Sequence, residues 1–494
     1  MVGVPVAVGV EPSPAGAPQS CTLHASSEKQ SLSHGQAHKL IAMLSIRAPD
    51  VPDDEQSARA PLDLVCCIDV SGSMRSENKM VLMKQTLDLL ITRSGLKDSD
   101  RLSLVTFDRN VQVKLGLTSM GVDGRQLASG IVKQLMPGST TNLSGGTLKA
   151  IDVLAQETGV CEGRSRSVLL FTDGLPTEGV TDTPTLVRAV KGALDASAAA
   201  SRHINLFSFG FGSDHNEDCL RSLATSSGPG GLYYYVRTAE DIPSAFADCL
   251  GGLVSVVAQN ATLVLRGAVD TLGRPRASIS RVLGGIYTRN PADGSIEIGD
   301  LFANDEKDLL IELELPAVPG PLEAEPTLLA SLRAFNIRSA TSETVDVVLS
   351  IGRPPETPPN QGTNAALELQ RIRIDAAEAM ENASRLADAG DLAAGRMVLS
   401  LTRERVANSM AHASSLGTAI VQEMDELSVQ YRSIQQYRSV GSKMSKSAAM
   451  SHACQRASHS TPEEAYAGAR AKKKAMKMAW TASMASSAMD EDSD

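Results

Sequence analysis

The sequence predicts an α/β fold in which a doubly wound, mostly parallel sheet is inserted in a β-sandwich, followed by a small helical bundle and a disordered tail. Three observations lead to this prediction. Strand-like and helical segments alternate from residue 62 to 252, as in a parallel sheet covered by helices on both faces. Short runs of alternating apolar and polar residues follow, which are typical of a sandwich. Amphipathic helical patterns begin after residue 364.

Length and composition fit a protein of several domains with aliphatic cores. The chain has 494 residues, of which 42% are hydrophobic and only 3% aromatic, so there is room for about three domains of ordinary size. A net charge of −10 argues against nucleic acid as the main partner. The seven cysteines are scattered without a C-x₂-C pair, which favours reduced thiols in a cytoplasmic protein.

The N-terminal part of the chain contains one clear strand pattern. Residues 1–20 are rich in Pro, Gly and Ala and lack the basic and apolar regions of a signal peptide, so we predict a disordered segment. The run at 39–47 looks like a strand, and a single strand is not stable alone. We therefore predict that residues 21–58 form the first part of the β-sandwich.

Residues 59–252 contain the predicted doubly wound domain. We expect its strands at 62–70, 101–107, 167–172, 204–210 and 232–236, with an antiparallel edge strand at 111–116. We expect its helices at 79–93, 125–135, 146–156, 183–200, 216–225 and 239–252. The first strand is apolar almost throughout, which is typical of a central strand that is buried on both faces.

Oxygen-bearing side chains lie at the end of this central strand and just beyond it. Asp69, Ser71 and Ser73 offer one carboxylate and two hydroxyl groups on a single loop. Parallel strands place ligand groups just past their carboxyl ends, and oxygen ligands suit a hard cation such as Mg²⁺. Alone, an Asp-x-Ser-x-Ser loop would more often cap the next helix than bind a metal.

Two distant residues are placed to complete such a site. Thr141 lies on a predicted loop, after Gly138 and before the helical pattern at 146–156. Asp173 directly follows the buried strand at 167–172 and precedes a glycine, which by itself indicates only a turn. Because the carboxyl ends of parallel strands meet at one edge of a sheet, both residues should lie near Asp69.

Together these motifs resemble the metal-ion-dependent adhesion site of the von Willebrand factor A domain family. The resemblance implies that one divalent cation, Mg²⁺ or else Mn²⁺ or Ca²⁺, is held by Asp69, Ser71, Ser73, Thr141 and Asp173. It also implies a protein partner whose Asp or Glu side chain completes the coordination of the metal. We predict no catalytic residue and expect a non-enzymatic, cation-dependent scaffold for protein binding.

After the doubly wound domain the pattern changes to short alternating strands. We expect strands at 262–266, 278–282, 295–299, 308–315 and 342–351, and we assign residues 253–355 to the second part of the β-sandwich. The doubly wound domain would then be inserted in the sandwich, which resembles an integrin-like hybrid domain carrying an A-domain.

Residues 360–437 are predicted to form a helical bundle. We expect helices at 365–387, 391–411 and 418–437, joined by short loops. The apolar stripe on the first helix is expected to lie in the bundle core and consists of Leu367, Ile374, Met380 and Leu386.

The bundle, with the segments 251–259 and 298–301, resembles intracellular eukaryotic A-domain proteins. That group includes plant-type ubiquitin ligases with a RING and A-domain proteins linked to a Hint module. The sequence shows no RING or Hint signature, so neither ligation nor self-splicing can be carried over from the resemblance.

Residues 438–494 are rich in Ser, Ala, Met and Lys and are predicted to be a disordered tail. The basic stretch at 471–480 could touch an acidic membrane or a calmodulin-like groove, but a solvated tail is the simpler explanation. No stretch approaches the length of a membrane span, so we expect no stable membrane association.

Two alternative functions stay open. The chain could be a substrate-recruiting or assembly subunit, associated with ubiquitin ligation, that binds through the helical bundle. It could also be a Mg²⁺-dependent, phosphatase-like enzyme with Asp69 as nucleophile. Such enzymes usually carry a second carboxylate two residues later, where this chain has Ser71, and no histidine lies in the three motif loops.

Overall fold

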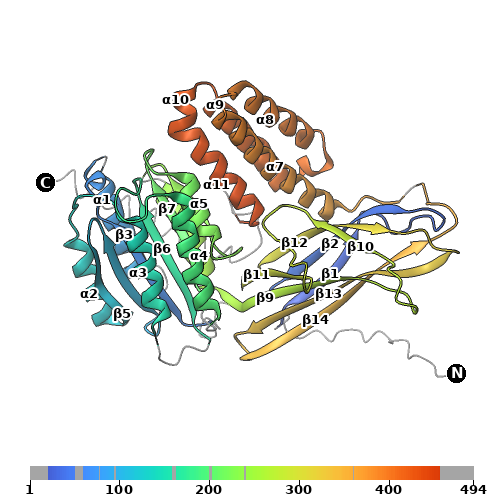
Figure 1. Cartoon of the computed structure of the whole chain (residues 1–494), viewed down its shortest axis with the longest axis horizontal. Helices are drawn as coiled ribbons and strands as arrows, with labels where there is room; N and C mark the ends of the chain where they lie inside the picture. The colour runs from blue at the N-terminus through green and yellow to red at the C-terminus, as the bar shows by residue number, and fades with distance from the viewer. Residues whose placement is uncertain are drawn as a thin grey trace.

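The computed structural model describes residues 20–50, 59–76, 78–93, 96–157, 163–199, 203–238, 241–359 and 361–456. They form an α/β domain, a β-sandwich and a helical bundle that lies over both (Figure 1). The predictions for residues 1–19 and for the basic stretch at 471–480 lie outside the described residues.

The α/β domain is built on a six-stranded sheet in the order β5-β4-β3-β6-β7-β8. Its strands are β3 (Leu62–Asp69), β4 (Arg101–Phe107), β5 (Val111–Ser119), β6 (Ser165–Thr172), β7 (Asn205–Phe211) and β8 (Tyr233–Val236). All neighbours pair in parallel except the edge strand β5, which is antiparallel to β4. Every residue of β3 and β6 is buried, which confirms the predicted doubly wound sheet.

The helices of this domain connect its strands. They are α1 (Lys79–Arg93), α2 (Val122–Lys133), α3 (Leu143–Ala155), α4 (Thr183–Ala199), α5 (Glu217–Thr225) and α6 (Ile242–Leu253). Helix α3 packs directly on β3 and β4. It begins after Asn142, whose side chain accepts a hydrogen bond of 2.9 Å from the Gly145 amide. This cap places the loop before α3 at the carboxyl edge of the sheet.

The β-sandwich consists of two four-stranded antiparallel sheets, ordered β1-β2-β12-β10 and β11-β9-β13-β14. Its strands are β1 (Thr22–Ser27), β2 (His38–Arg47), β9 (Val256–Gly267), β10 (Ser278–Val282), β11 (Ser295–Phe302), β12 (Glu306–Leu315), β13 (Leu322–Asn336) and β14 (Thr341–Arg353). Strand β2 pairs with β12 along its whole length, from His38 opposite Leu315 to Arg47 opposite Glu306. The chain therefore leaves the sandwich for the α/β domain and returns to it, as the sequence predicts.

Two strands of the sandwich are absent from the sequence-based prediction, β1 and β13. Strand β13 carries Glu323 and Glu325 near its start and contains Pro326, and a proline usually argues against a strand. The pairing of β13 with β14 shifts register between Pro326 and Leu328, and this irregularity accommodates the proline. Glu325 beside it is buried and forms an ion pair of 3.1 Å with the buried Arg353 of β14.

The helical bundle contains α7 (Ala365–Asp388), α8 (Leu392–Ala407), α9 (Ser415–Gln430), α10 (Ile434–Gln436) and α11 (Ser442–Ala453). The predicted stripe on α7 is divided between two cores. Met380 lies in the bundle core, whereas Leu367 and Ile374 pack with Met43 and Leu310 of the sandwich. The first half of α7 thus anchors the bundle on the sandwich.

Helix α11 differs from the prediction that a disordered tail begins at residue 438. The segment forms a helix because partners distant in sequence hold it. The Lys446 ammonium lies 2.8 Å from an oxygen of Asp218 and 3.1 Å from one of Asp388. Met450 is buried in the core of the α/β domain. A stretch of Ser, Ala, Met and Lys shows no apolar stripe that would predict such a helix.

Within the described ranges, none of the helices combines the length and the apolar character that crossing a membrane requires.

Candidate metal site

The five residues predicted to bind a metal lie at the carboxyl edge of the parallel sheet. Asp69 ends β3, and the short helix η2 (Gly72–Arg75) follows it directly. Thr141 lies in the loop before α3, and Asp173 directly follows β6. Two main-chain hydrogen bonds hold the first two loops together, from Gly72 N to Ser139 O and from Gly138 N to Val70 O.

Asp69 is fully buried, and both of its carboxylate oxygens are hydrogen-bonded. The Ser71 amide donates to Oδ1 at 2.7 Å, and the Thr172 hydroxyl donates to Oδ2 at 2.6 Å. Burial raises the pKa of Asp69 to about 6, the two hydrogen bonds oppose this shift, and the nearby Asp173 adds to it. A cation at this place would stabilise the charged form.

A chain of hydroxyl groups joins this loop to Asp173. The Oγ atoms of Ser71 and Ser73 lie 2.9 Å apart, and the Ser73 hydroxyl donates to Asp173 Oδ1 at 2.7 Å. Asp173 is fully buried. Two side chains of the loop after β3 and the carboxylate after β6 therefore form one connected group.

Thr141 lies beside the same group. A Cβ atom built on Gly174 would lie 3.4 Å from Ser73 Oγ and 3.6 Å from Thr141 Oγ1, so both hydroxyls face the main chain next to Asp173. The Thr141 amide donates to the Thr177 hydroxyl at 2.9 Å, which fixes this loop against the segment after β6. The structure thus brings all five predicted residues together.

Lys79, the first residue of α1, belongs to this cluster although sequence reasoning missed it. Its ammonium lies 3.0 Å from Asp173 Oδ2 and 3.3 Å from Asp214 Oδ2. Burial by itself would lower the pKa of Lys79, but the carboxylates of Asp173 and Asp214 outweigh it and raise this pKa. A lysine at a helix N-terminus, where positive charge is unfavourable, is the signal that could have indicated an acidic partner.

The donor set fits a hard cation. Two buried carboxylates and three hydroxyl groups provide oxygen ligands alone, and such ligands suit Mg²⁺ and Mn²⁺. Among the described residues, no three or more His, Cys, Asp or Glu side chains gather closely enough to hold a metal by themselves. A metal here would therefore depend on the serine and threonine hydroxyls and on water.

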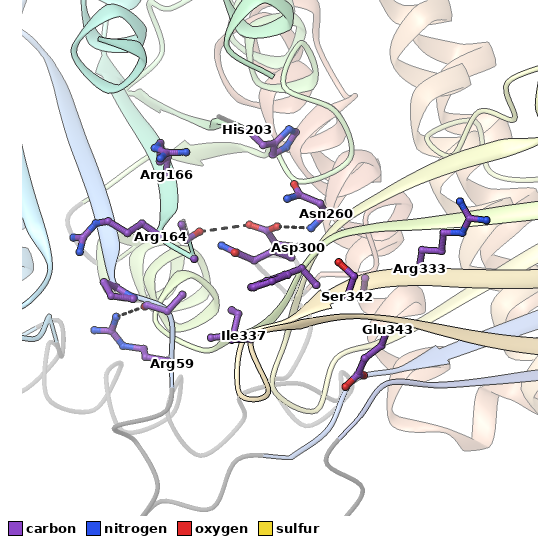
Figure 2. Close-up of a pocket in the computed structure, with 18 of the residues that line it drawn as sticks. Arg59, Arg164, Arg166, His203, Asn260, Asp300, Arg333, Ile337, Ser342 and Glu343 are labelled. Carbon is purple, nitrogen blue, oxygen red and sulfur yellow. Dashed lines mark hydrogen bonds between the residues drawn. The ribbon is translucent and has the colours of Figure 1, made fainter. Parts of the chain in front are cut away.

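A cavity of about 860 Å³ lies away from this cluster, where the α/β domain meets the sandwich (Figure 2). Several of its charged groups already bind within the protein. Arg164 forms an ion pair of 2.7 Å with Asp63, and Asp300 accepts hydrogen bonds from Asn205 of the α/β domain and from the Asn260 amide of the sandwich. The contact between Asn205 and Asp300 connects the two domains, and the other two hold each domain together, so we assign the polar lining a structural role.

Comparison with known proteins identifies the α/β domain. Residues 63–248 match the family model of the von Willebrand factor type A domain. The solved structure of a von Willebrand factor type A protein from Catenulispora acidiphila superposes with a TM-score of 0.63 at 15% identity, over 84% of this chain and 91% of that one. The two folds are therefore similar beyond residues 63–248, which the family model matches.

The curated relatives include plant ubiquitin ligases and animal inter-alpha-trypsin inhibitor heavy chains. E3 ubiquitin-protein ligase WAV3 of Arabidopsis thaliana is 27% identical over 368 residues, which cover 72% of this chain and 44% of the relative. WAVH1 of the same plant is 27% identical over 67% of this chain and 42% of its own length. Human inter-alpha-trypsin inhibitor heavy chain H1 is 32% identical over 161 residues, or 32% of this chain and 16% of that protein. The chain thus spans less than half the length of each of these relatives.

The relatives contradict the expectation that the chain is not an enzyme. WAV3 and WAVH1 are named as E3 ubiquitin-protein ligases, and WAVH2 is named as a probable one. The expectation was wrong because it rested on the resemblance to an adhesion domain and on the absence of a RING signature from the sequence. Ubiquitin ligation also depends on recruitment of the protein to be modified, and a domain that recruits needs no RING of its own.

Proposed function

We propose that this chain, whose residues 63–248 form a von Willebrand factor type A domain, recruits a protein for ubiquitin ligation through a divalent cation at the carboxyl edge of its sheet. The observation that carries the proposal is the convergence of Asp69, Ser71, Ser73, Thr141 and Asp173 on one group of oxygen atoms.

In this proposal Asp69 and Asp173 supply the charge that holds the cation, and the three hydroxyl groups supply neutral ligands. Two carboxylates nearly neutralise Mg²⁺, so the ion still attracts a further carboxylate at an open coordination position. An Asp or Glu side chain of the recruited protein would provide that carboxylate. Binding of the partner would then require the metal and would be lost with a chelator.

The plant relatives support the link to ubiquitin ligation. Their similarity covers 72% and 67% of this chain, so it is not confined to the von Willebrand factor type A domain. We place this recruitment in the cytoplasm, where thiols stay reduced. The cysteines that the structure describes are buried and form no disulfide among themselves, namely Cys21, Cys66, Cys67, Cys219, Cys249 and Cys454.

A second candidate surface lies on the helical bundle. Met397 and Leu401 lie one turn apart on α8 and are 63% and 55% exposed, and Met410 just beyond α8 is 76% exposed. Apolar side chains that gather on one helix are typical of an interaction site. A partner bound here would need no metal, and this distinguishes the two candidates.

Affinity capture from cell extract can separate the two surfaces. We expect a set of proteins to bind the chain in Mg²⁺ and to be lost with EDTA or with Asp69→Asn, but to remain with the double variant Met397→Ser, Leu401→Ser. Ubiquitin on those proteins should fall when Asp69→Asn replaces the natural chain in cells. Partners that ignore EDTA and disappear only with the α8 variant would favour the second candidate.

A further inference from the structure

Lys79 brings a positive charge into the proposed metal site. Its side chain is only 3% exposed, and its ammonium lies 3.0 Å from Asp173 Oδ2, inside the site. On its other side lies Asp214 Oδ2, at 3.3 Å, and the Asp214 side chain is 64% exposed. Lys79 therefore contacts one buried and one solvent-exposed carboxylate at the same time.

The position of Lys79 is electrostatically costly in two ways. A buried ammonium loses its hydration, and the N-terminus of α1 carries a partial positive charge that repels it. Its compensation comes from the carboxylates, above all from Asp173, which would otherwise be a buried charge beside the buried Asp69. In this structure a side-chain cation thus balances a carboxylate that we assign to the metal.

We propose that Lys79 is a resident cation of the site, which a divalent ion displaces from Asp173 toward Asp214 when it binds. This inference rests on the proposed function and concerns the regulation of the same site. Formally, the carboxylates of Asp69, Asp173 and Asp214 and the ammonium of Lys79 sum to two negative charges. One divalent cation neutralises that charge, and Lys79 keeps a partner throughout.

Asp214 is suited to receive the ammonium. It lies on the loop between β7 and α5, and its exposed side chain can follow Lys79 without opening the core. Lys79 would accordingly lower the affinity for metal, because the ion must first compete for Asp173. Asp214 would raise that affinity, because it holds the displaced ammonium.

Calorimetric titration of the full chain with Mn²⁺ tests this inference. Removal of a unit charge beside the metal in Lys79→Met should tighten binding by about tenfold. Asp214→Asn should weaken binding, and its effect should largely vanish when combined with Lys79→Met, since Asp214 acts through the ammonium. The matched control is Lys191→Met, which removes the exposed Lys191 paired with Asp195 on α4, and it should bind as the natural chain does.

The outcomes separate this inference from the proposed function. If the natural chain binds Mn²⁺ and Lys79→Met binds equally or more weakly, Lys79 is no competitor and the inference fails while the metal site stands. If neither protein binds Mn²⁺ although both are folded by circular dichroism, both proposals fail. If Lys79→Met does not fold, Asp214→Asn decides alone, and unchanged affinity in that variant overturns the inference.

Discussion

Among single residues, Asp69 couples the site most directly to pH. Its carboxylate is fully buried, and burial raises its pKa to about 6, with Asp173 adding to the shift and the Thr172 and Ser71 hydrogen bonds opposing it. A metal ion requires the charged carboxylate. Protons and metal therefore compete for this residue close to physiological pH.

We expect Mg²⁺ to raise the midpoint of thermal unfolding strongly at about pH 7.5 and weakly at about pH 5. Below the Asp69 pKa of about 6, each pH unit should reduce the apparent metal affinity about tenfold, because the carboxyl must first lose its proton. Scanning fluorimetry at both pH values measures the shift. Equal shifts at the two pH values would contradict this assignment, and Asp69→Asn should show no shift at either.

The stability of the metal-free, chelator-treated protein should depend on pH in the opposite sense. The folded-state pKa of Asp69 lies above its usual value of 3.8, so the folded protein binds more protons than the unfolded chain between about pH 4 and 6. The free energy of unfolding should therefore fall as the pH rises through this window, by up to about 3 kcal/mol. Urea titrations of the natural chain and of Asp69→Asn measure the difference, and parallel pH profiles would count against it.

Most of the candidate site could be predicted from the sequence. Asp69 ends one apolar strand and Asp173 directly follows another, and parallel strands bring such ends to one edge of the sheet. Lys79 and Asp214 were not predicted, because their contacts join segments far apart in the chain. The position of Lys79 at a helix N-terminus indicates at most an acidic partner and does not say which one.

Among the elements, α3 packs closely against β4 of the sheet. A Cβ atom on Gly146 would lie 2.4 Å from the Phe107 ring, which is less than any real contact allows. The fit of α3 on β4 therefore requires glycine here. The same helix is preceded by the loop that carries Thr141.

We expect Gly146→Ala to lower the free energy of unfolding by about 1–3 kcal/mol, because the methyl group must push Phe107 or α3 aside. The matched control is Gly130→Ala in α2, where an added Cβ meets nothing within 4 Å and should be neutral or slightly stabilising. Denaturant titration of both variants gives the comparison. Equal stability of the two would contradict the close packing of α3.

The sequence predicts those elements whose apolar residues form a clear local pattern, and it misses those without one. Strands β3 and β6 are continuous apolar runs of strand length, and both are correctly predicted. Strand β13 is missed because glutamates and Pro326 obscure its alternation, and the buried pair of Glu325 and Arg353 appears only in the folded sheet. Helix α11 is missed because its contacts are tertiary.

For the whole molecule, α11 and the residues just past it connect all three units. Lys446 binds Asp218 of the α/β domain and Asp388 of the bundle. Gln455, just past the helix, donates a hydrogen bond of 2.8 Å to the Asp308 carbonyl of the sandwich and accepts one of 2.9 Å from its amide. Figure 1 shows α11 between the α/β domain and the rest of the bundle.

We expect Lys446→Met to loosen α11 from the α/β domain, because it leaves Asp218 and Asp388 close together without their shared cation. Hydrogen exchange should become faster by about tenfold or more in α11 and in β8, against which it packs. Arg403→Met, which breaks an exposed ion pair with Asp425 inside the bundle, is the control. Unchanged exchange in Lys446→Met would show that apolar contacts alone hold the helix.

The most direct test of metal-dependent recruitment is calorimetric titration of the chelator-treated 494-residue chain with Mg²⁺ and Mn²⁺, beside Asp69→Asn. Asp182→Asn, at the exposed N-terminus of α4, is the control for loss of a carboxylate elsewhere. We predict binding of about one ion per chain to the natural protein and to the control, and none to Asp69→Asn. A folded natural chain that binds no ion, or an Asp69→Asn variant that binds as tightly, would contradict the metal-dependent recruitment proposed for this protein.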